Sequence, residues 1–467
     1  MRAQLQQWIA AHRQELLEDL AGLIAIPSVS RAGADSLPYG KDCRHALGYA
    51  QSLAQRMGFT TTVYEDAVLT VDNGSEPLSL AILAHLDVVP VGEEWDTDPY
   101  VLTEKDGYLY GRGVTDDKGP AIASLYAMAA VRELFPQRAA ACRLWLGTAE
   151  ETGSADLKHW LKNHTMPPYV ITPDTVDPIM NGESAKYRPA ISATWEASDV
   201  LPRVTYLQGG RVRNAIPPTA EALVAGLHAC EVQALADTWA QQTGVQFTLT
   251  DTDNGLQICA HGKGAHIGKP HLGRNGQTAL VELLAQLPLA DCGSTRAIRS
   301  LAQLFPYGDS HGTALGLTVR DEIMGPCSVN CTTCTLTEEG VVCQFDSRGP
   351  TNATEDNYPR VIDAALRGAG FTVEESQMDN AHYVSPDTEV VMAMKEIWQL
   401  VHGTPATCTF NFAGSYAHFV DGAIAIGRAT PGVETNIHKA NECLPLKDLE
   451  RLVELLALSI LRFCPEK

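Results

Sequence analysis

Four short segments of this 467-residue sequence carry side chains that bind metal ions or transfer protons. Their ligand-type residues are histidine and carboxylates, without cysteine, and that mixture suits zinc, manganese or cobalt in a hydrolytic site. The residues are His85 and Asp87 in LAHLDVVP, Asp116 and Asp117 in GRGVTDDKGP, Glu150 and Glu151 in GTAEETGS, and Asp174 in VITPDTVDP.

Neighbouring residues in these segments need not have the same role. His85 can bind a metal through one ring nitrogen while Asp87 accepts the proton of the other, which fixes the tautomer and raises ligand basicity. Of two adjacent glutamates, one can bind metal while the other serves as general base. Each segment alone is also explained by a solvated loop, a turn or a cap. Their joint placement after strands favours a metal site.

Short apolar runs precede two of these segments. LSLAILAH (78–85) and CRLWLG (142–147) are typical of strands buried on both faces, and KGPAIASLYAMAAVREL (118–134) predicts a helix between them. Strand, helix and strand at this spacing indicate an α/β layer with a mostly parallel sheet. Ligands bind beyond the carboxyl ends of strands in such sheets, so we expect the polar segments to converge there.

The middle of the chain has a different pattern. EALVAGL (221–227) and VELLAQL (281–287) suggest helices, whereas VQFTLTD and GVVCQFD suggest paired strands. The earlier pattern resumes near residue 384 and returns to a strand, AIAIG. We therefore predict an α/β catalytic domain made of residues 1–187 and 384–467, interrupted by an inserted α+β lid domain at 188–383.

Composition narrows the range of partners. The net charge of −21 argues against nucleic acid or an anionic membrane surface as a partner. No apolar run is long enough to span a membrane, and the first residues lack the pattern of a secretory signal. We therefore expect a cytoplasmic protein with reduced, mostly buried cysteines. Cys331 and Cys334 have C-x-x-C spacing, but we interpret them as strand residues.

Taken together, the motifs resemble the co-catalytic zinc metallopeptidase family that includes aminoacylases, acetylornithine deacetylase, succinyl-diaminopimelate desuccinylase and glutamate carboxypeptidases. The chain is most similar to the bacterial PepV-type dipeptidases over nearly its whole length. EEWDTDP (93–99), GRGVTDDKGP (111–120) and PIMNGE (178–183) carry the likeness.

The resemblance implies two zinc ions per chain, with manganese or cobalt as substitutes. His85, Asp116 and Asp174 would hold one ion. Asp116, Glu151 and His438 would hold the other. His438 lies in ETNIHKANE, and spacing alone does not single it out.

The resemblance also assigns the remaining site residues. Glu150 would be the general base that takes a proton from the attacking water and passes it to the leaving amine. In the lid, Asn214 and His266 would bind substrate and the oxyanion, and Arg348 would clamp a substrate carboxylate. The remaining assignments are Asp87, counted with the catalytic residues, and Gly414 and Ser415 in the substrate loop AGSYAHF (413–419).

The sequence departs from the PepV-type pattern at two positions near the expected substrate pocket. His418 stands where an arginine is common, and Gly349 stands where the lid motif has tyrosine. The family likeness also implies a cis peptide bond between Asp116 and Asp117. The departures leave the metal chemistry in place and bear on substrate preference.

These observations predict a metallo-dipeptidase that acts on free dipeptides, including β-alanyl ones. The alternatives are a deacylase of N-acyl amino acids with the same metals and a non-catalytic metal-binding homologue. A monomer is expected, because the enlarged lid takes the place of the partner subunit that supplies the lid histidine in other family members.

Overall fold

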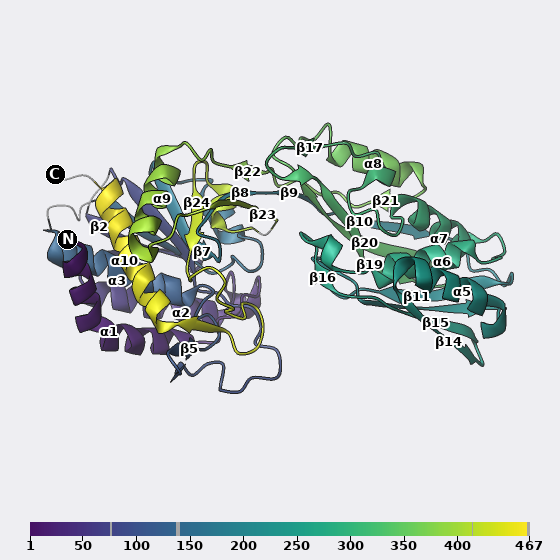
Figure 1. Cartoon of the computed structure of the whole chain (residues 1–467), viewed down its shortest axis with the longest axis horizontal. Helices are drawn as coiled ribbons and strands as arrows, with labels where there is room; N and C mark the ends of the chain where they lie inside the picture. Colours follow the sequence, from purple (N-terminus) through teal and green to yellow (C-terminus); the bar gives the residue numbers. More distant parts are fainter. Residues whose placement is uncertain (75–76, 137–140, 413, 465–467) are drawn as a thin grey trace. The chain divides into compact units, whose positions relative to one another are not determined.

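A computed structural model describes residues 1–74, 77–136, 141–412 and 414–464 of the chain. The chain divides into two compact units (Figure 1). The first comprises Met1–Glu183, His382–Phe410 and Gly414–Lys467; the second comprises Ser184–Ala381 and Asn411–Ala413. Domain boundaries were expected after residues 187 and 383. Ala413, part of the predicted substrate loop, lies outside the described residues.

The first unit is built on a mixed sheet with the strand order β1-β2-β6-β3-β7-β24-β8-β22, and β23 pairs with β8. The four central strands β6, β3, β7 and β24 run parallel, whereas the flanking strands pair antiparallel. The strands are β1 (Thr60–Tyr64), β2 (Val68–Gly74), β3 (Leu80–His85), β6 (Ala141–Gly147), β7 (Tyr169–Thr175), β8 (Ile179–Glu183), β22 (His382–Tyr383), β23 (Cys408–Asn411) and β24 (Ile424–Gly427).

Both faces of this sheet are covered, which explains the continuous apolar runs. Along β3, Leu80, Ile82 and Ala84 join one hydrophobic cluster, whereas Ala81 and Leu83 join a second cluster on the opposite face. Alternate residues of a strand point to opposite faces, so a strand covered on both sides needs apolar residues throughout. The prediction of a buried α/β sheet is confirmed.

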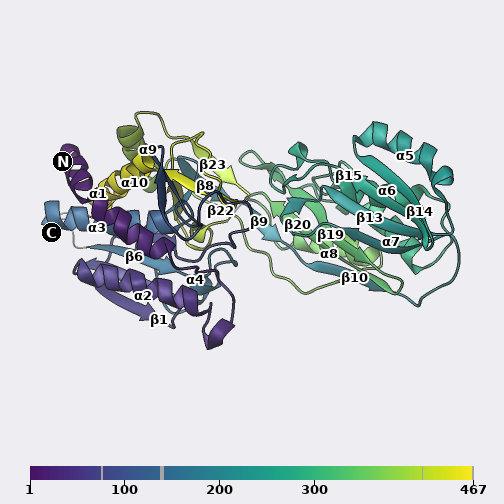
Figure 2. The same ribbon diagram turned by 90° about the horizontal axis from the view of Figure 1, so that it is seen from below.

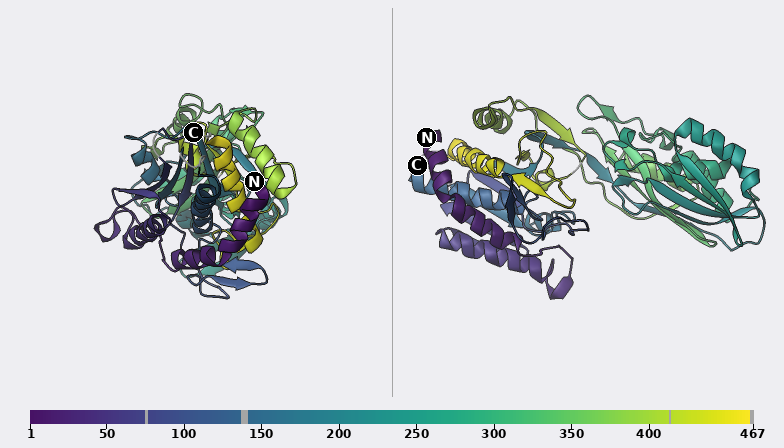
Figure 3. Two further views of the ribbon diagram at one scale, coloured as in Figure 1. Left: turned by 90° about the vertical axis from the view of Figure 1, so that its left-hand side faces the viewer. Right: turned by 60° about the horizontal axis from the view of Figure 1, so that its bottom comes forward.

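Helices from the two ends of the chain pack together on the larger of these clusters. Helix α3 contacts both α1 and α10, and α1 also contacts α10 and α2 (Figure 3). The helices of the unit are α1 (Arg2–Ile24), α2 (Lys41–Arg56), α3 (Lys118–Leu134), α4 (Ala155–Trp160), α9 (Glu389–His402) and α10 (Leu446–Phe463). A three-stranded sheet of β4 (Thr103–Lys105), β5 (Tyr108–Tyr110) and β25 (Cys443–Pro445) completes it.

The second unit is built on an antiparallel sheet (Figure 2). It has its own hydrophobic core. The strand order of the sheet is β14-β15-β13-β11-β19-β20-β10-β21, and β9 pairs with β20. The strands are β9 (Ala185–Tyr187), β10 (Ala190–Thr194), β11 (Arg203–Gly209), β13 (Thr219–Ala225), β14 (Gln246–Thr252), β15 (Gly255–His261), β19 (Ser328–Leu336), β20 (Gly340–Gly349) and β21 (Thr372–Val373). The helices are α5 (Ala229–Thr243), α6 (Gly276–Gln286), α7 (Gly293–Leu304) and α8 (Pro359–Gly368). Two short ribbons pair β12 (Ala215–Ile216) with β16 (Ala265–His266) and β17 (Arg320–Asp321) with β18 (Gly325–Pro326).

One predicted helix of this unit is wrong. EALVAGL (221–227) lies largely in strand β13, in which Ala220, Ala222 and Val224 are buried in alternation. The segment pairs on both sides, with β11 and β15, so tertiary pairing overrides a pattern that also fits a helix. VELLAQL is helical in α6, and Cys331 and Cys334 are strand residues of β19, as predicted.

The described residues contain no helix with the length and apolar character needed to cross a membrane. All twelve cysteines are free thiols.

Candidate metal centre

His85 is the last residue of β3 and is completely buried. Its Nδ1 lies 2.9 Å from the backbone oxygen of Asp87 and 3.4 Å from the Asp87 carboxylate. A carbonyl oxygen only accepts, so Nδ1 carries a proton. The other ring nitrogen, Nε2, lies 3.1 Å from Asp116 Oδ1. The contacts of Nδ1 with Asp87 therefore fix the orientation of the imidazole ring, and Nε2 faces the Asp116 carboxylate.

Asp116 lies in the turn that leads into α3, and the buried carboxylate of Glu442 holds this turn. Glu442 accepts hydrogen bonds from the backbone amides of Gly113, Thr115 and Asp116, at 3.1, 2.9 and 3.0 Å. It also pairs with buried Arg112 at 2.7 Å. The peptide bond between Asp116 and Asp117 is cis, as predicted. Glu442 belongs to ETNIHKANE, but nothing in its spacing indicated this role.

The loop with Glu150 and Glu151 follows β6 and is held by two aspartates. The Asp87 carboxylate accepts the backbone amides of Glu150 and Glu151, at 3.2 and 3.1 Å. Asp156 accepts the amides of Thr148 and Ala149, at 2.6 and 2.9 Å. Asp87 thus positions both the His85 ring and the glutamate loop. Neither the motifs nor their spacing indicated this role of Asp156.

His438 reaches this cluster from a loop far along the chain. Its Nε2 lies 3.0 Å from Asp116 Oδ2 and 3.1 Å from Glu151 Oε1. The backbone of His438 has a φ of 62°, in the left-handed region. Burial works against protonation of His438, but its hydrogen bonds to Asp116 and Glu151 prevail and raise its pKa to about 10. Glu151 and Asp116 therefore form one acceptor pair for this ring.

Two groups of potential metal ligands result, and they share one carboxylate. In each group, one ligand atom per residue lies within 4.8 Å of the others. The groups are His85, Asp116 and Asp174, and Asp116, Glu151 and His438. Imidazole nitrogen and carboxylate oxygen are ligands that zinc, manganese and cobalt accept, and a shared carboxylate is the arrangement of two-metal sites. The structure thus brings together all five predicted ligands in sets that suit divalent ions.

Several acidic side chains of this cluster have raised pKa values, but Asp116 is an exception: despite its burial, the charge of Arg428 and the hydrogen bonds from His438 and His85 hold its pKa well below the ordinary value. Burial, followed by the negative charge of Asp174, raises the pKa of Glu150 well above its ordinary value. Burial raises the pKa of Glu151 to about 7 and that of Asp174 to about 6. The buried carboxylates repel one another, so positive charge placed among them stabilises the cluster.

One such charge comes from Arg428, which none of the sequence motifs indicated. Arg428 follows β24, and its side chain is 5% exposed. Its Nη1 donates to Asp116 Oδ1 at 3.1 Å and also to Asp174 Oδ1. A charged residue directly after an apolar strand, in AIAIGRATPG, was the available signal.

The predicted substrate loop contacts another buried carboxylate, that of Glu183. Ser415 donates from its amide and its hydroxyl to Glu183, at 3.0 and 2.6 Å. His418 is buried, with Nδ1 3.2 Å from the same carboxylate. Gly414 precedes these residues in the loop. None of them belongs to the two ligand groups.

Asn214, His266 and Arg348 lie in the second unit. Ile267 donates its backbone amide to the oxygen of Asn214 at 3.1 Å, next to the short pairing of β12 with β16 that includes His266. Arg348 donates from Nε and Nη2 to Asp346, at 2.6 and 2.8 Å. Burial, followed by the positive charge of Arg348, lowers the pKa of His266. The roles of these three residues toward substrate stay predictions.

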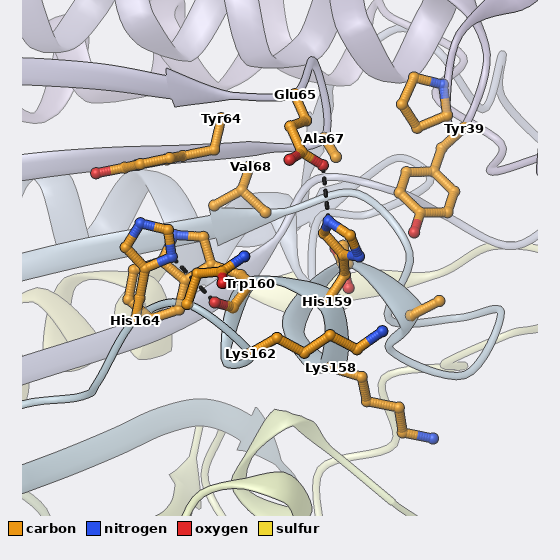
Figure 4. Close-up of a pocket in the computed structure, with 14 residues that line it drawn as sticks. Tyr39, Tyr64, Glu65, Ala67, Val68, Lys158, His159, Trp160, Lys162 and His164 are labelled. Carbon is orange, nitrogen blue, oxygen red and sulfur yellow. Dashed lines mark hydrogen bonds and ion pairs between the residues drawn. The ribbon is translucent and has the colours of Figure 1, made fainter.

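A cavity of about 490 Å³ lies elsewhere in the first unit, around α4 (Figure 4). Tyr64, Trp160 and His164 form an aromatic wall, in which the Trp160 and His164 rings stack with centroids 4.4 Å apart. On the side of the cavity opposite this wall, His159 pairs with Glu65. No predicted metal ligand lines this cavity, so it is distinct from the candidate metal centre.

Residues 81–462, more than half of the chain, match the profile of Peptidase family M20/M25/M40. The chain therefore belongs to this peptidase family. It is 26% identical over 453 residues to the putative dipeptidase YtjP of Bacillus subtilis, a match that covers 96% of this chain and 97% of the relative. It is also 26% identical over 443 residues to the Beta-Ala-Xaa dipeptidase of Lactobacillus delbrueckii subsp. lactis, covering 94% of each.

Solved structures show the same fold. Human carnosine dipeptidase 1 aligns with a TM-score of 0.59 at 17% identity, covering 99% of this chain and 98% of that one. Aminoacylhistidine dipeptidase from Vibrio alginolyticus aligns with a TM-score of 0.57 at 14% identity, covering 97% of both chains. The predicted family and fold class are thus confirmed.

Proposed function

We propose that this protein is a metallo-dipeptidase that hydrolyses the amide bond of free dipeptides, including those that begin with β-alanine. The observation that carries the proposal is the pair of ligand groups sharing Asp116, with Glu150 on the same loop as Glu151. The names of its relatives, putative dipeptidase and Beta-Ala-Xaa dipeptidase, support the choice of substrate.

We further propose two zinc ions per chain, with manganese or cobalt as substitutes, held by the two ligand groups. Ions bound there would polarise the scissile carbonyl and acidify the attacking water. Glu150 would accept the proton of that water and return it to the leaving amine, because it is adjacent to a ligand without being one. Asp87 fixes the position of the His85 ring relative to the Glu150 backbone, because it contacts both.

The other assignments stay part of the proposal. In it, Asn214, His266, Arg348 and the Gly414–Ser415 loop bind substrate, as the family resemblance implies. The protein would act as a cytoplasmic monomer. A deacylase of N-acyl amino acids would use the same metal centre and differ only in the pocket for the acyl group.

Amine release from a panel of free dipeptides, tripeptides and N-acyl amino acids tests the proposal. We expect zinc- or manganese-loaded protein to turn over dipeptides, and protein stripped with a chelator to be inactive until metal is restored. Preferential turnover of N-acyl amino acids would assign the protein to the deacylases. Activity that survives complete metal removal would contradict the metal-dependent mechanism.

A further inference from the structure

Arg428 occupies the space between two of the candidate ligands. Its Nη1 hydrogen-bonds Asp116 Oδ1 and Asp174 Oδ1, and it lies 4.0 Å from Asp117 Oδ1. The guanidinium is buried, and its Nε has no hydrogen-bond partner among the described residues. The backbone amide of Arg428 donates to Thr175 at 3.0 Å, which anchors the residue beside β7. The side chain is therefore built into the cluster.

The two ligand groups differ in what this arginine contacts. Asp116 and Asp174 are two of the three residues in the His85 group, and both of their Oδ1 atoms accept from Arg428. In the His438 group, Arg428 reaches only the shared Asp116, through the oxygen that His438 does not contact. No arginine or lysine pairs with Glu151 in the part of the chain that the structure describes.

The charge of Arg428 cannot be removed by ordinary changes of pH, because a guanidinium stays protonated in proteins. A divalent ion in the His85 group has to share Asp116 and Asp174 with this cation or displace it. Both routes lower the affinity of that group, the first through repulsion of like charges and the second through loss of the existing ion pairs. In the His438 group, an ion competes with Arg428 only at the shared Asp116.

We propose that Arg428 makes the two metal positions unequal. The position formed by Asp116, Glu151 and His438 binds its ion tightly, and the position formed by His85, Asp116 and Asp174 binds a second ion weakly and exchangeably. Arg428 is thus a positioning residue that compensates the carboxylates when the second ion is absent. This inference rests on the proposed metal-dependent function, and metal binding tests it without reference to turnover.

The experiment measures zinc binding to metal-stripped protein by competition with a chromophoric chelator. We expect the unsubstituted protein to bind two ions whose dissociation constants differ by at least about tenfold, and Arg428→Met to tighten the weaker site by about tenfold or more. Two further variants, each lacking a ligand of one metal position, allow the other position to be measured alone. With His438→Ala, Arg428→Met should tighten the remaining site, whereas with His85→Ala it should change the remaining site by less than about threefold.

Arg451→Met is the matched control. Arg451 donates to Thr430 and Asp448, near the segment that carries Arg428, but contacts no candidate ligand. It should leave both dissociation constants unchanged. Arg428→Gln repeats the test with a polar side chain in case the methionine variant does not fold, and circular dichroism establishes folding for each protein.

A second readout follows from the same competition. Without metal, Arg428 offsets the repulsion of the carboxylates, so Arg428→Met should lower the melting temperature of the stripped protein more than that of the zinc-loaded protein. Equal affinities at both positions, or a weaker second site in the variant, would overturn the inference and leave the proposed function intact. Failure of the unsubstituted protein to bind zinc at all would overturn the proposed function as well.

Discussion

Glu150 and Glu151 are neighbours in sequence but have different proposed roles, and substituting each residue alone distinguishes these roles. Glu151 Oε1 lies 3.1 Å from His438 and belongs to a ligand group, whereas Glu150 belongs to none. We expect Glu150→Ala to reduce turnover of a dipeptide by at least about a hundredfold, because it removes the proton carrier. Zinc stoichiometry, measured by plasma mass spectrometry, should stay that of the parent protein.

Glu151→Ala serves as the contrasting variant. It should lose zinc from the His438 group as well as activity, because a ligand is removed. Substantial turnover by Glu150→Ala would remove Glu150 from the role of general base.

The loss of Glu442 should disturb the metal centre without removing a ligand. Its carboxylate is the partner of buried Arg112 and of three backbone amides in the turn around Asp116. Removing one member of a buried ion pair typically costs about 3–5 kcal/mol. We therefore expect Glu442→Ala to lower the free energy of unfolding by that amount in urea titrations and to weaken zinc binding.

Glu442→Gln keeps the shape of the side chain and should have a smaller effect on both quantities. An alanine variant as stable as the parent protein would show that the turn does not depend on Glu442.

At the scale of a single element, helix α9 contains a histidine that should respond to acid. The His402 ring stacks on Trp398, with centroids 3.8 Å apart, and its buried Nδ1 has no hydrogen-bond partner among the residues that the structure describes. Burial, followed by the charge of Arg451, lowers the pKa of His402 to about 4 despite the opposing charge of Asp448. In the unfolded chain the pKa is about 6.5. The unfolded state therefore binds more protons than the folded state between these two values.

This difference makes the contribution of His402 to stability complete above pH 6.5 and progressively lost as the pH falls towards 4. His402→Phe keeps an aromatic ring on Trp398 but cannot titrate. We expect urea unfolding to show that acidification from pH 7 to pH 4.5 destabilises the parent protein more than this variant. Parallel losses in the two proteins would show that His402 does not contribute.

For the molecule as a whole, we expect a monomer in solution. This prediction rests on the resemblance to the PepV-type enzymes, in which an enlarged lid takes the place of the partner subunit; here Asn214, His266 and Arg348 belong to the second unit, Ser184–Ala381 and Asn411–Ala413. Multi-angle light scattering should give a mass near 50.4 kDa across a range of protein concentrations. A stable dimer would contradict the prediction and point to residues shared between subunits.

The sequence alone determined the local elements and the types of ligand. The apolar runs before His85 and Glu150 are strands β3 and β6, because a strand buried on both faces must be apolar throughout. His438 was assigned as a ligand from the family motifs, because spacing alone does not indicate it. The segment 221–227 was misjudged, because pairing with β11 and β15 decides its conformation and neither partner is visible locally.

Only the tertiary structure decided how the charges of the site are arranged. Glu442, Asp156 and Arg428 each act through contacts with residues distant in sequence or through backbone amides, and no periodicity records such contacts. A carboxylate or guanidinium has its effect through what lies within a few ångströms of it, and folding brings those groups together from separate segments. The sequence therefore determined which ligands the site has, whereas the fold placed a permanent cation against two ligands of the His85 group and against only the shared Asp116 of the His438 group.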